Sequence, residues 1–375
     1  MNRRAFLSTL LGSSLPLVLG RRALAQAAPP RPRIGAIRWD AWYDPADGKV
    51  AQAVEKSLGP AEFHYRMPFF GKETGPDSVR INGCTQEIID REIAAASAAG
   101  LAYWAYCAYA PSDPLSNALH LHLSSKRRSD IAFCLIAGME SSMDYFKAQT
   151  DYQLSLMREP GYMKVLNGRP LFFIFGAADE QIARSGGLPR MLEWVQHMRS
   201  ELQKSGHGNP YFVLSEWTPA RAVRLCRELQ LDAVGLYATF ATPVGATPYK
   251  MLAEKTESYW NKFAATGLNV VPNILSGWNT RPRKRNPPPW NAPKAPVDPH
   301  SYFQDGTPQE IAQHVADAVQ WIKSHPAQAL AHIGLIYAWD ECDEGFGALL
   351  PTYDRKNPQG NDARLKAIGA VLNKT

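Results

Sequence analysis

Four carboxylates crowd into five positions near the C-terminus: Asp340, Glu341, Asp343 and Glu344. They directly follow an apolar run at 333–339, whose length and flanking glycines are typical of a buried strand. Carboxylates at the end of a buried strand cost free energy unless they are solvated, paired or used in chemistry. Two carboxyl groups that flank one bond are what the hydrolysis of a glycosidic bond requires. The stretch is therefore a candidate catalytic site, and the plainer alternative is a solvated turn.

The rest of the chain alternates apolar runs with helical patterns, a rhythm that predicts parallel strands joined by helices. The predicted strands cover residues 34–43, 101–109, 130–138, 171–175, 211–217, 231–238, 268–275 and 333–339. The predicted helices cover residues 85–100, 116–125, 143–157, 188–205, 219–229, 248–266 and 307–324. Two of these helices carry start signals, because Thr85 is an N-cap residue and Thr307 with Glu310 predicts a capping box.

Strands and helices in this order are most simply closed into a single-domain (β/α)8 TIM barrel, an α/β fold. The alternative is an open, doubly wound sheet, which usually carries a Gly-rich phosphate loop after its first strand. Arg38, Trp39 and Asp40 stand there instead. The barrel is predicted to cover residues 33–375, with one long loop at 276–306 that holds seven prolines. We expect a surface loop, whose early part could instead form a wall of the barrel mouth.

In such a barrel the carboxyl ends of the strands meet at one mouth, where the chemistry takes place. Aromatic rings and carboxylates gather at these predicted ends, and this combination suits a sugar, whose apolar faces stack on rings. The candidate substrate-binding residues are Trp39, Asp40, Trp42, Tyr106, Glu140, Glu216, Trp217, Tyr237, Trp278, Asn279, Arg281, Trp339 and Asp340. Each of them taken alone also fits a structural role in the core or in an ion pair.

The N-terminus has the pattern of an export signal. Arg3 and Arg4 precede Phe6 and Leu7 and an apolar stretch, so residues 1–27 resemble a twin-arginine signal peptide, with an ordinary secretory leader as the alternative. A linker at 28–32 follows. We therefore expect a bacterial periplasmic or secreted protein that uses the Tat export machinery as a precursor, without stable membrane insertion.

Charge and cysteine content exclude several functions. The formal charge of +6 falls to about +2 without the four arginines of residues 1–27, since 37 basic and 35 acidic residues remain, so nucleic acid is not an expected partner. The five cysteines have no paired spacing, and we expect no disulfide framework, metal site or other cofactor. Cys342 as a nucleophile would need a His partner, which the sequence does not place near it.

Several stretches resemble the barrels of glycoside hydrolase families 71 and 99, and most of all a bacterial branch known as O-antigen-associated glycosyltransferases. Residues 133–135 resemble the third strand of that branch, and residues 167–174 its fourth. Residues 277–283 resemble its Trp-Asp-Asn-Thr-Pro-Arg signature with one residue lost. Residues 338–345 resemble Ala-Trp-Asn-Glu-Trp-x-Glu-Gly, with both Glu and the Gly in register.

The resemblance implies a TIM-barrel glycosidase without a cofactor, a retaining endo-α-mannosidase that passes through a 1,2-anhydro sugar. Glu341 would deprotonate the sugar 2-hydroxyl, and Glu344 would act as acid and base at the glycosidic oxygen. The chain departs from this family pattern at two positions. It has Asp340 where the pattern has Asn, and Cys342 where the pattern has Trp. Two other functions stay open: a glycan-binding barrel without catalysis, and a glycosyltransferase of polysaccharide biosynthesis.

Overall fold

The chain divides into two units, Met1–Pro30 and Arg31–Thr375, and the second is described here by itself. The computed structural model describes residues 30–44, 48–138, 143–175, 178–291, 298–345 and 348–374, without the side chains of 143–148. The predicted leader at 1–27 lies outside the described residues, as do the first two residues of the predicted linker.

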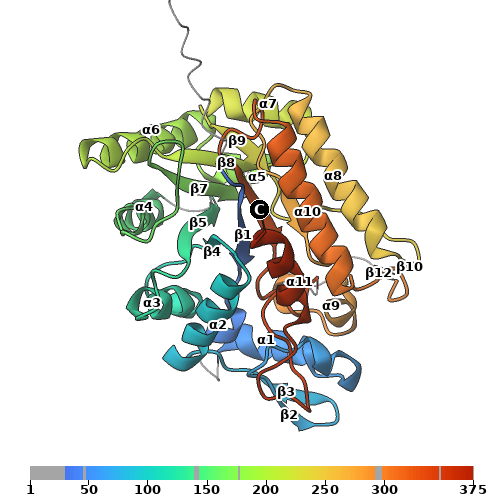
Figure 1. The fold of residues 1–375 in the computed structure, drawn as a ribbon. Coiled ribbons are helices and arrows are strands. Elements are labelled where there is room, and N and C mark those ends of the chain that lie inside the picture. Colours follow the sequence, from blue (N-terminus) through green and yellow to red (C-terminus); the bar gives the residue numbers. More distant parts are fainter. Residues whose placement is uncertain are drawn as a thin grey trace, which may run out of the picture. The chain divides into compact units, whose positions relative to one another are not determined.

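The centre of the second unit is a barrel of eight parallel strands (Figure 1). The strands in chain order are β1 (Arg33–Arg38), β4 (Tyr103–Cys107), β5 (Ala132–Gly138), β7 (Arg169–Phe175), β8 (Tyr211–Ser215), β9 (Ala233–Gly235), β11 (Asn273–Leu275) and β13 (Ile333–Tyr337). Neighbours follow the order β11-β13-β1-β4-β5-β7-β8-β9. The two ends of this path meet where Val234 donates to the Asn269 carbonyl at 2.9 Å and accepts from Val271 at 2.9 Å. The predicted TIM barrel is confirmed, since this contact nearly closes it.

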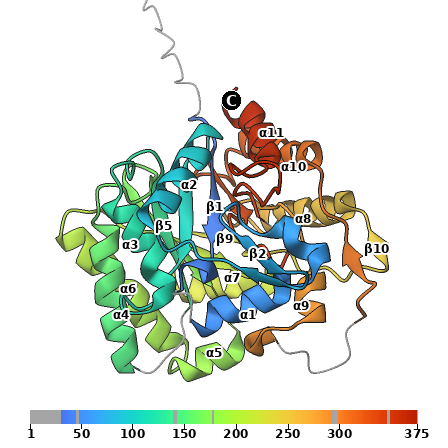
Figure 2. The same cartoon turned by 90° about the horizontal axis from the view of Figure 1, so that it is seen from below.

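Helices lie around the outside of the strands (Figures 1 and 2). They are α1 (Lys49–Leu58), α2 (Gln86–Ala98), α3 (Asn117–Ser124), α4 (Met143–Met157), α5 (Asp179–Arg184), α6 (Leu188–Lys204), α7 (Pro219–Glu228), α8 (Tyr249–Ala264), α9 (Arg281–Arg285), α10 (Pro308–Ser324) and α11 (Ala363–Leu372). The strands are apolar on both faces because these helices cover the outer one. Phe172 of β7 and Phe212 of β8, for example, contact Trp194 of α6 with ring centroids 5.7 and 5.8 Å apart.

Short elements decorate the connections. The hairpin β2 (Lys72–Gly75) and β3 (Ser78–Arg80) follows α1, and β6 (Lys164–Val165) pairs with β7. Two short strands, β10 (Ala246–Thr247) and β12 (Tyr302–Phe303), join the loop after β9 to the long loop after β11. Of the described helices, none is long and apolar enough to cross a membrane.

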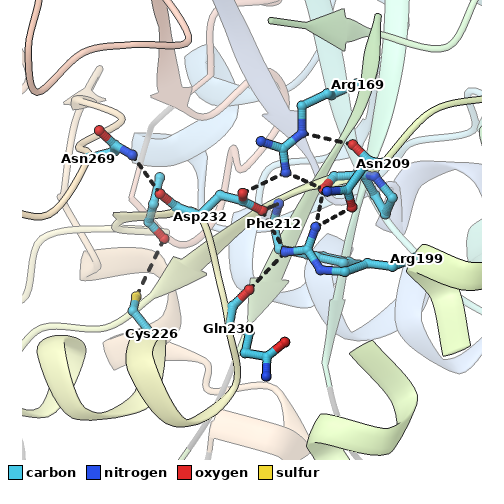
Figure 3. A network of polar contacts seen from close by, with 10 residues as sticks. Arg169, Arg199, Asn209, Phe212, Cys226, Gln230, Asp232 and Asn269 are labelled. Carbon is cyan, nitrogen blue, oxygen red and sulfur yellow. Dashed lines mark hydrogen bonds and ion pairs between the residues drawn. The ribbon is translucent and has the colours of Figure 1, made fainter. Parts of the chain in front are cut away.

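An ion-pair network binds the amino-terminal ends of three barrel strands, opposite the ends where a barrel carries its chemistry (Figure 3). Asp232, just before β9, pairs with Arg169 of β7 at 2.5 Å and with Arg199 of α6 at 2.8 Å. Its carboxylate also accepts from the Phe212 amide at 3.0 Å, and its carbonyl accepts from Asn269 at 2.9 Å. The network therefore holds the closing segment of the barrel against its neighbours.

Candidate active site

A cavity of about 630 Å³ opens at the carboxyl ends of the barrel strands. Its aromatic lining residues are Trp39, Tyr109, Phe175, Trp194, Trp217, Tyr237, Phe240, Trp278 and Trp290. Glu341 and Glu344 are the only carboxylates among the described residues that line it. Polar side chains of α4, Gln149 and Gln153, add to one wall. A concave, mostly aromatic surface with two acids is the geometry expected of a small-molecule or glycan site.

Glu341 follows β13 and is almost fully buried, with its side chain 3% exposed. The Tyr237 hydroxyl donates to its Oε1 at 3.0 Å, while its Oε2 has no hydrogen-bond partner in the described part of the chain. Burial raises the pKa of Glu341 well above its usual range, and the negative charge of Glu344 raises it further. Arg283 opposes this shift from 3.7 Å. The burial of Glu341 thus favours its neutral form.

Glu344 lies three residues on, with its side chain 23% exposed. Its two oxygens have different partners: Arg283 Nη1 lies 2.9 Å from Oε1, and the Tyr337 hydroxyl donates to Oε2 at 3.1 Å. The next residue must be small, because a Cβ at Gly345 would lie 2.9 Å from the Tyr337 ring and 3.1 Å from the Gly277 carbonyl. The glycine therefore allows the long loop at 276–306 to pack closely against residues 340–345, which we call the acid turn.

Arg283 of α9 is the cation of the site. Its Nε and Nη2 donate to the two oxygens of Asp343 at 2.8 and 3.1 Å, and its guanidinium lies 5.3 Å from the centre of the Trp39 ring. Burial lowers the pKa of Arg283, but Asp343 and Glu344 raise it more, so the group stays charged. The long loop after β11 thus supplies a wall of the cavity, which extends to Trp290.

A second charged cluster is buried around Arg38, at the end of β1. Arg38 pairs with Asp40 at 2.6 Å and with Glu92 of α2 at 2.7 Å, while Asp340 lies 3.9 Å away. Asp340 also accepts from the backbone amide of Trp39 at 3.0 Å, which fixes the wall of the cavity to the acid turn. The cluster therefore links the first and last strands with one cation and three carboxylates.

One cation cannot neutralise three buried carboxylates, and the pKa values of all three carboxyl groups are raised as a result. Burial raises the pKa of Asp340 well above its usual range, and the charge of Asp40 adds to this. Burial also raises the pKa of Asp40 and of Glu92, against the lowering effect of Arg38. A carboxyl whose pKa is raised on folding stabilises the fold at low pH and loses that contribution as the pH rises through the raised value.

Asp340→Asn is therefore expected to raise stability at neutral pH. Asn keeps an acceptor for the Trp39 amide, replaces the ionisable oxygen by an NH2 donor that can face Asp40, and carries no charge. We expect Tm to rise by about 2–4 °C at pH 8, on the order of 1 kcal/mol, and by less at pH 4. Thermal melts across this pH range measure the difference, with exposed Asp77→Asn as the control. A variant no more stable than the wild type at pH 8 would contradict this account.

The fold is similar to that of a family 99 glycoside hydrolase. The GH99 endo-α-mannosidase from Bacteroides thetaiotaomicron matches with a TM-score of 0.55 at 14% identity, over 91% of this chain and 97% of that one. The GH99 endo-α-mannosidase from the same bacterium in complex with bis-tris propane gives 0.53 at 14% identity, over 91% and 96%. No protein-family model and no curated protein matches the chain. The resemblance to family 99 barrels is confirmed at the level of the fold.

Six of the predicted site residues do line the cavity. They are Trp39, Trp217, Tyr237, Trp278, Glu341 and Glu344. They come from the ends of β1, β8, β9, β11 and β13, as expected if the strand ends converge. Glu140, which was predicted at the end of the third strand, lies outside the described residues.

Five other predicted residues belong to the buried cluster around Arg38 and do not line the cavity. They are Asp40, Trp42, Tyr106, Trp339 and Asp340. Trp42 donates to the Asp340 carbonyl at 3.0 Å, and Trp339 donates to Glu92 at 3.2 Å. All five side chains are buried. The structure places them where they support the cavity wall.

Three more predicted residues are engaged elsewhere and do not line the cavity. Asn279 is buried and donates to Asp305 at 2.7 Å, while Arg281 stacks on Tyr302 with its guanidinium 4.1 Å from the ring centre. Glu216 accepts from the backbone amides of the two residues that follow it, each at 2.8 Å, and pairs with Arg221 at 3.3 Å. In each case the polar group is engaged by a nearby carboxylate, ring or donor and not by the cavity.

Arg283, Phe175, Phe240 and Trp290 are among the cavity residues that were not predicted as site residues from the sequence. Phe175 ends β7 and could have been found from its position at a strand end. Phe240 follows β9, and Trp290 lies in the long loop, where residue type alone gives no direction. Of the described His, Cys, Asp and Glu side chains, no group of three or more could hold a metal ion.

Proposed function

We propose that this protein is a glycosidase that hydrolyses an oligo- or polysaccharide with Glu341 and Glu344. The observation that carries the proposal is the cavity itself, where these two acids are the only described carboxylates among nine aromatic rings. One guanidinium contacts both acids, at 3.7 and 2.9 Å, so they are close enough to act on one bond. The similarity of the fold to GH99 endo-α-mannosidases supports an α-mannoside as substrate.

In this proposal the reaction needs two different acids. One carboxyl gives a proton to the leaving oxygen, while the other carboxylate accepts the proton of the sugar 2-hydroxyl, as the sequence resemblance implies for Glu344 and Glu341. The 2-oxygen then displaces the leaving group from C1 with inversion and forms the 1,2-anhydro sugar. Water opens this ring at C1 with a second inversion, giving its proton to Glu344 while Glu341 returns a proton to the 2-oxygen, so the overall result is retention. The Tyr237 and Tyr337 hydroxyls, at 3.0 and 3.1 Å, hold the two carboxyls in place. Positioned proton transfer of this kind contributes about 10²–10⁴-fold to a rate.

Two aromatic platforms flank the acids. Trp217, Phe240 and Trp278 follow β8, β9 and β11, and Phe240 contacts both tryptophans, with ring centroids 4.9 and 6.0 Å apart. Trp39 follows β1, and Trp290 packs edge-on against it at 5.7 Å. Since β13 lies between β11 and β1 in the barrel, the two platforms stand on opposite sides of Glu341. Such an arrangement favours a glycan that continues beyond the cleaved bond in both directions.

Phe240→Ala and Trp290→Ala are expected to weaken glycan binding. Both rings are exposed, at 57% and 47%, although they line the cavity, so their loss should disturb the fold little. We expect about fivefold weaker binding of α-mannan oligosaccharides for each variant, on the order of 1 kcal/mol. Calorimetry on the Glu344→Gln background measures binding without turnover. Met251→Ala of α8, which removes an exposed side chain outside the cavity, is the control. If all these variants bind with equal affinity, the two aromatic platforms do not bind the glycan.

We also propose that the protein is exported by the twin-arginine route to the periplasm or the medium. Support comes from Arg3 and Arg4 before the apolar stretch of residues 1–27. Changing both arginines to Lys is expected to keep the precursor inside the cell, which fractionation of expressing cells would show. Unchanged export of this double variant would point to an ordinary secretory leader.

A further inference from the structure

The side of the cavity opposite the two acids is formed in part by α4. In the order of the barrel strands, β7 lies four places from β13, so the ends of these two strands face each other across the barrel. The helix α4 lies between β5 and β7 in the chain, and its Gln149 and Gln153 line the cavity. The Trp194 indole of α6 donates to Thr150 at 2.9 Å, which anchors this part of α4 to its neighbour. The two glutamines are therefore held in place on that side.

Gln153 brings a buried carboxamide to the cavity. The residue is 6% exposed, and its neighbours in the fold leave its polar group to the cavity. Within the described part of the chain its side chain makes no hydrogen bond, although a carboxamide has two donor hydrogens and an acceptor oxygen. Buried polar groups are normally hydrogen-bonded, because leaving them unpaired costs free energy. Gln153 is therefore placed to hydrogen-bond a molecule that enters the cavity.

Two further residues complete this side of the cavity. Gln149 lies one helical turn before Gln153, on the same face of α4, and is buried as well. Phe175 ends β7 and also lines the cavity, with its ring 4.8 Å from the Tyr237 ring. The Tyr237 hydroxyl in turn donates to Glu341 at 3.0 Å, so two rings connect this side with the acids. Carboxamides beside an aromatic ring can bind the hydroxyl groups and the apolar face of one sugar unit.

The charges of the cavity decide which sugars it can accept. Of the described residues that line it, only Arg283, Glu341 and Glu344 are charged residues. Each nitrogen of the Arg283 guanidinium already faces a carboxylate oxygen, with Nε and Nη2 at 2.8 and 3.1 Å from Asp343 and Nη1 at 2.9 Å from Glu344. The described lining thus offers no further cation to a phosphate, sulfate or uronate group. The carboxylates nearby disfavour such an anion, since like charges repel each other.

We propose that Gln153, together with Gln149 and Phe175, forms a subsite that binds a neutral sugar unit through its hydroxyl groups, on the side of the cavity opposite the acids. The role of this subsite in catalysis rests on the proposed glycosidase function, whereas the binding of a neutral sugar does not. The substrate class is then a neutral glycan, and glycans with phosphate, sulfate or uronate groups at this position are rejected. A site built to hydrogen-bond a hydroxyl discriminates against a ligand that lacks it, because its own polar group is then left unpaired.

Calorimetry on the Glu344→Gln protein, the parent of this series, tests the subsite without turnover. The neutral probe is an α-mannan oligosaccharide, and the anionic probe is the same oligosaccharide with a phosphate monoester. Gln153→Leu keeps much of the side-chain volume but removes its hydrogen-bonding groups, so we expect about five- to tenfold weaker binding of the neutral probe. Gln196→Leu changes an exposed glutamine of α6 outside the cavity and should leave the affinity unchanged. The parent should bind the anionic probe about tenfold more weakly than the neutral probe, or weaker still.

Neutral probes that each lack one hydroxyl group separate a binding role of Gln153 from a structural one. For at least one of them, the parent and Gln153→Leu should bind equally, because the hydroxyl partner of Gln153 is already missing. A structural defect would weaken the binding of every probe by the same factor. Gln153→Met, which also lacks the carboxamide, takes the place of Gln153→Leu if that variant does not fold.

The proposal is overturned if the variants at position 153 bind the neutral probe as tightly as the parent, or if all probes lose affinity equally. It is also overturned if the parent binds the anionic probe as tightly as the neutral one, or binds neither. Release of reducing ends by the wild type is measured separately. Binding that depends on Gln153, in a protein that cleaves no glycan, would leave the subsite standing and remove the glycosidase function. Turnover together with an unchanged affinity of Gln153→Leu would do the reverse.

Discussion

Replacing Glu344 by Gln is expected to lower the rate of α-mannan hydrolysis by about 10²–10⁴-fold. Gln keeps the shape of the side chain and an acceptor for the Tyr337 hydroxyl, but it can neither give nor take a proton at the leaving oxygen. Glu341→Gln should lose a similar factor because it removes the other half of the proton transfer. Rates of reducing-sugar release, measured at saturating substrate, provide the comparison.

The fold of both variants should be preserved, which circular dichroism and thermal melts would show. Glu254→Gln of α8 is a matched control, since its exposed carboxylate pairs only with Lys250 among the ion pairs described and does not line the cavity. It should keep the wild-type rate. If Glu341→Gln and Glu344→Gln also kept that rate, the two acids would have no part in the chemistry.

The second large effect concerns stability, at Arg38. This side chain is fully buried, pairs with Asp40 and Glu92, and lies 4.4 Å from the centre of the Trp104 ring. Arg38→Met keeps much of the volume but leaves buried carboxylates without their cation. Removing one partner of a buried ion pair costs about 3–5 kcal/mol. Urea denaturation at pH 7 should therefore show a loss of this size in the free energy of unfolding.

The loss should be larger at high pH than at low pH, because the carboxyls around position 38 are neutral at low pH and need no cation. Arg38→Lys should lose less than Arg38→Met, since it keeps the charge while giving up the paired geometry. Arg80→Met provides a contrast, because the Arg80 side chain is 47% exposed and its pair with Glu55 should contribute about 0–1 kcal/mol. A loss below about 1 kcal/mol for Arg38→Met would show that the cluster is not a structural centre.

The sequence predicted helices and their caps well, because these features depend on interactions between residues that are close in the chain. The helix predicted at 143–157 has these bounds in the structure, and the capping box of Thr307 and Glu310 is present. Thr85 accepts from the Ile88 amide, as an N-cap does. Period, capping and turn residues act over a few positions, so the sequence carries them directly.

Strand ends were predicted less well because distant residues decide them. The first strand was predicted to run to residue 43, but β1 ends at Arg38. The Trp39 amide donates to the side chain of Asp340 at the other end of the chain, and a 3-10 turn follows. The last strand likewise ends at Tyr337, two residues earlier than predicted. No local pattern shows that an amide will leave the sheet for a distant carboxylate.

The acid turn illustrates the same limit for the site. The sequence placed four acids at one strand end, but it could not separate Glu341 and Glu344, which line the cavity, from Asp340 and Asp343, which do not. The separation depends on Arg38 and Arg283, which approach from β1 and from the long loop. Partners of this kind are fixed by tertiary packing, and their identity cannot be read from spacing alone.

Proton NMR of an α-mannan digest tests the central claim most directly. The spectrum follows new reducing ends and their anomeric form in real time, in parallel for the wild type and Glu341→Gln. A glycosidase that uses Glu341 and Glu344 with retention should release ends that appear first as the α-anomer, and the variant should release almost none. Ends that appear first as the β-anomer would contradict retention, and a wild type that releases none would contradict the proposed hydrolysis.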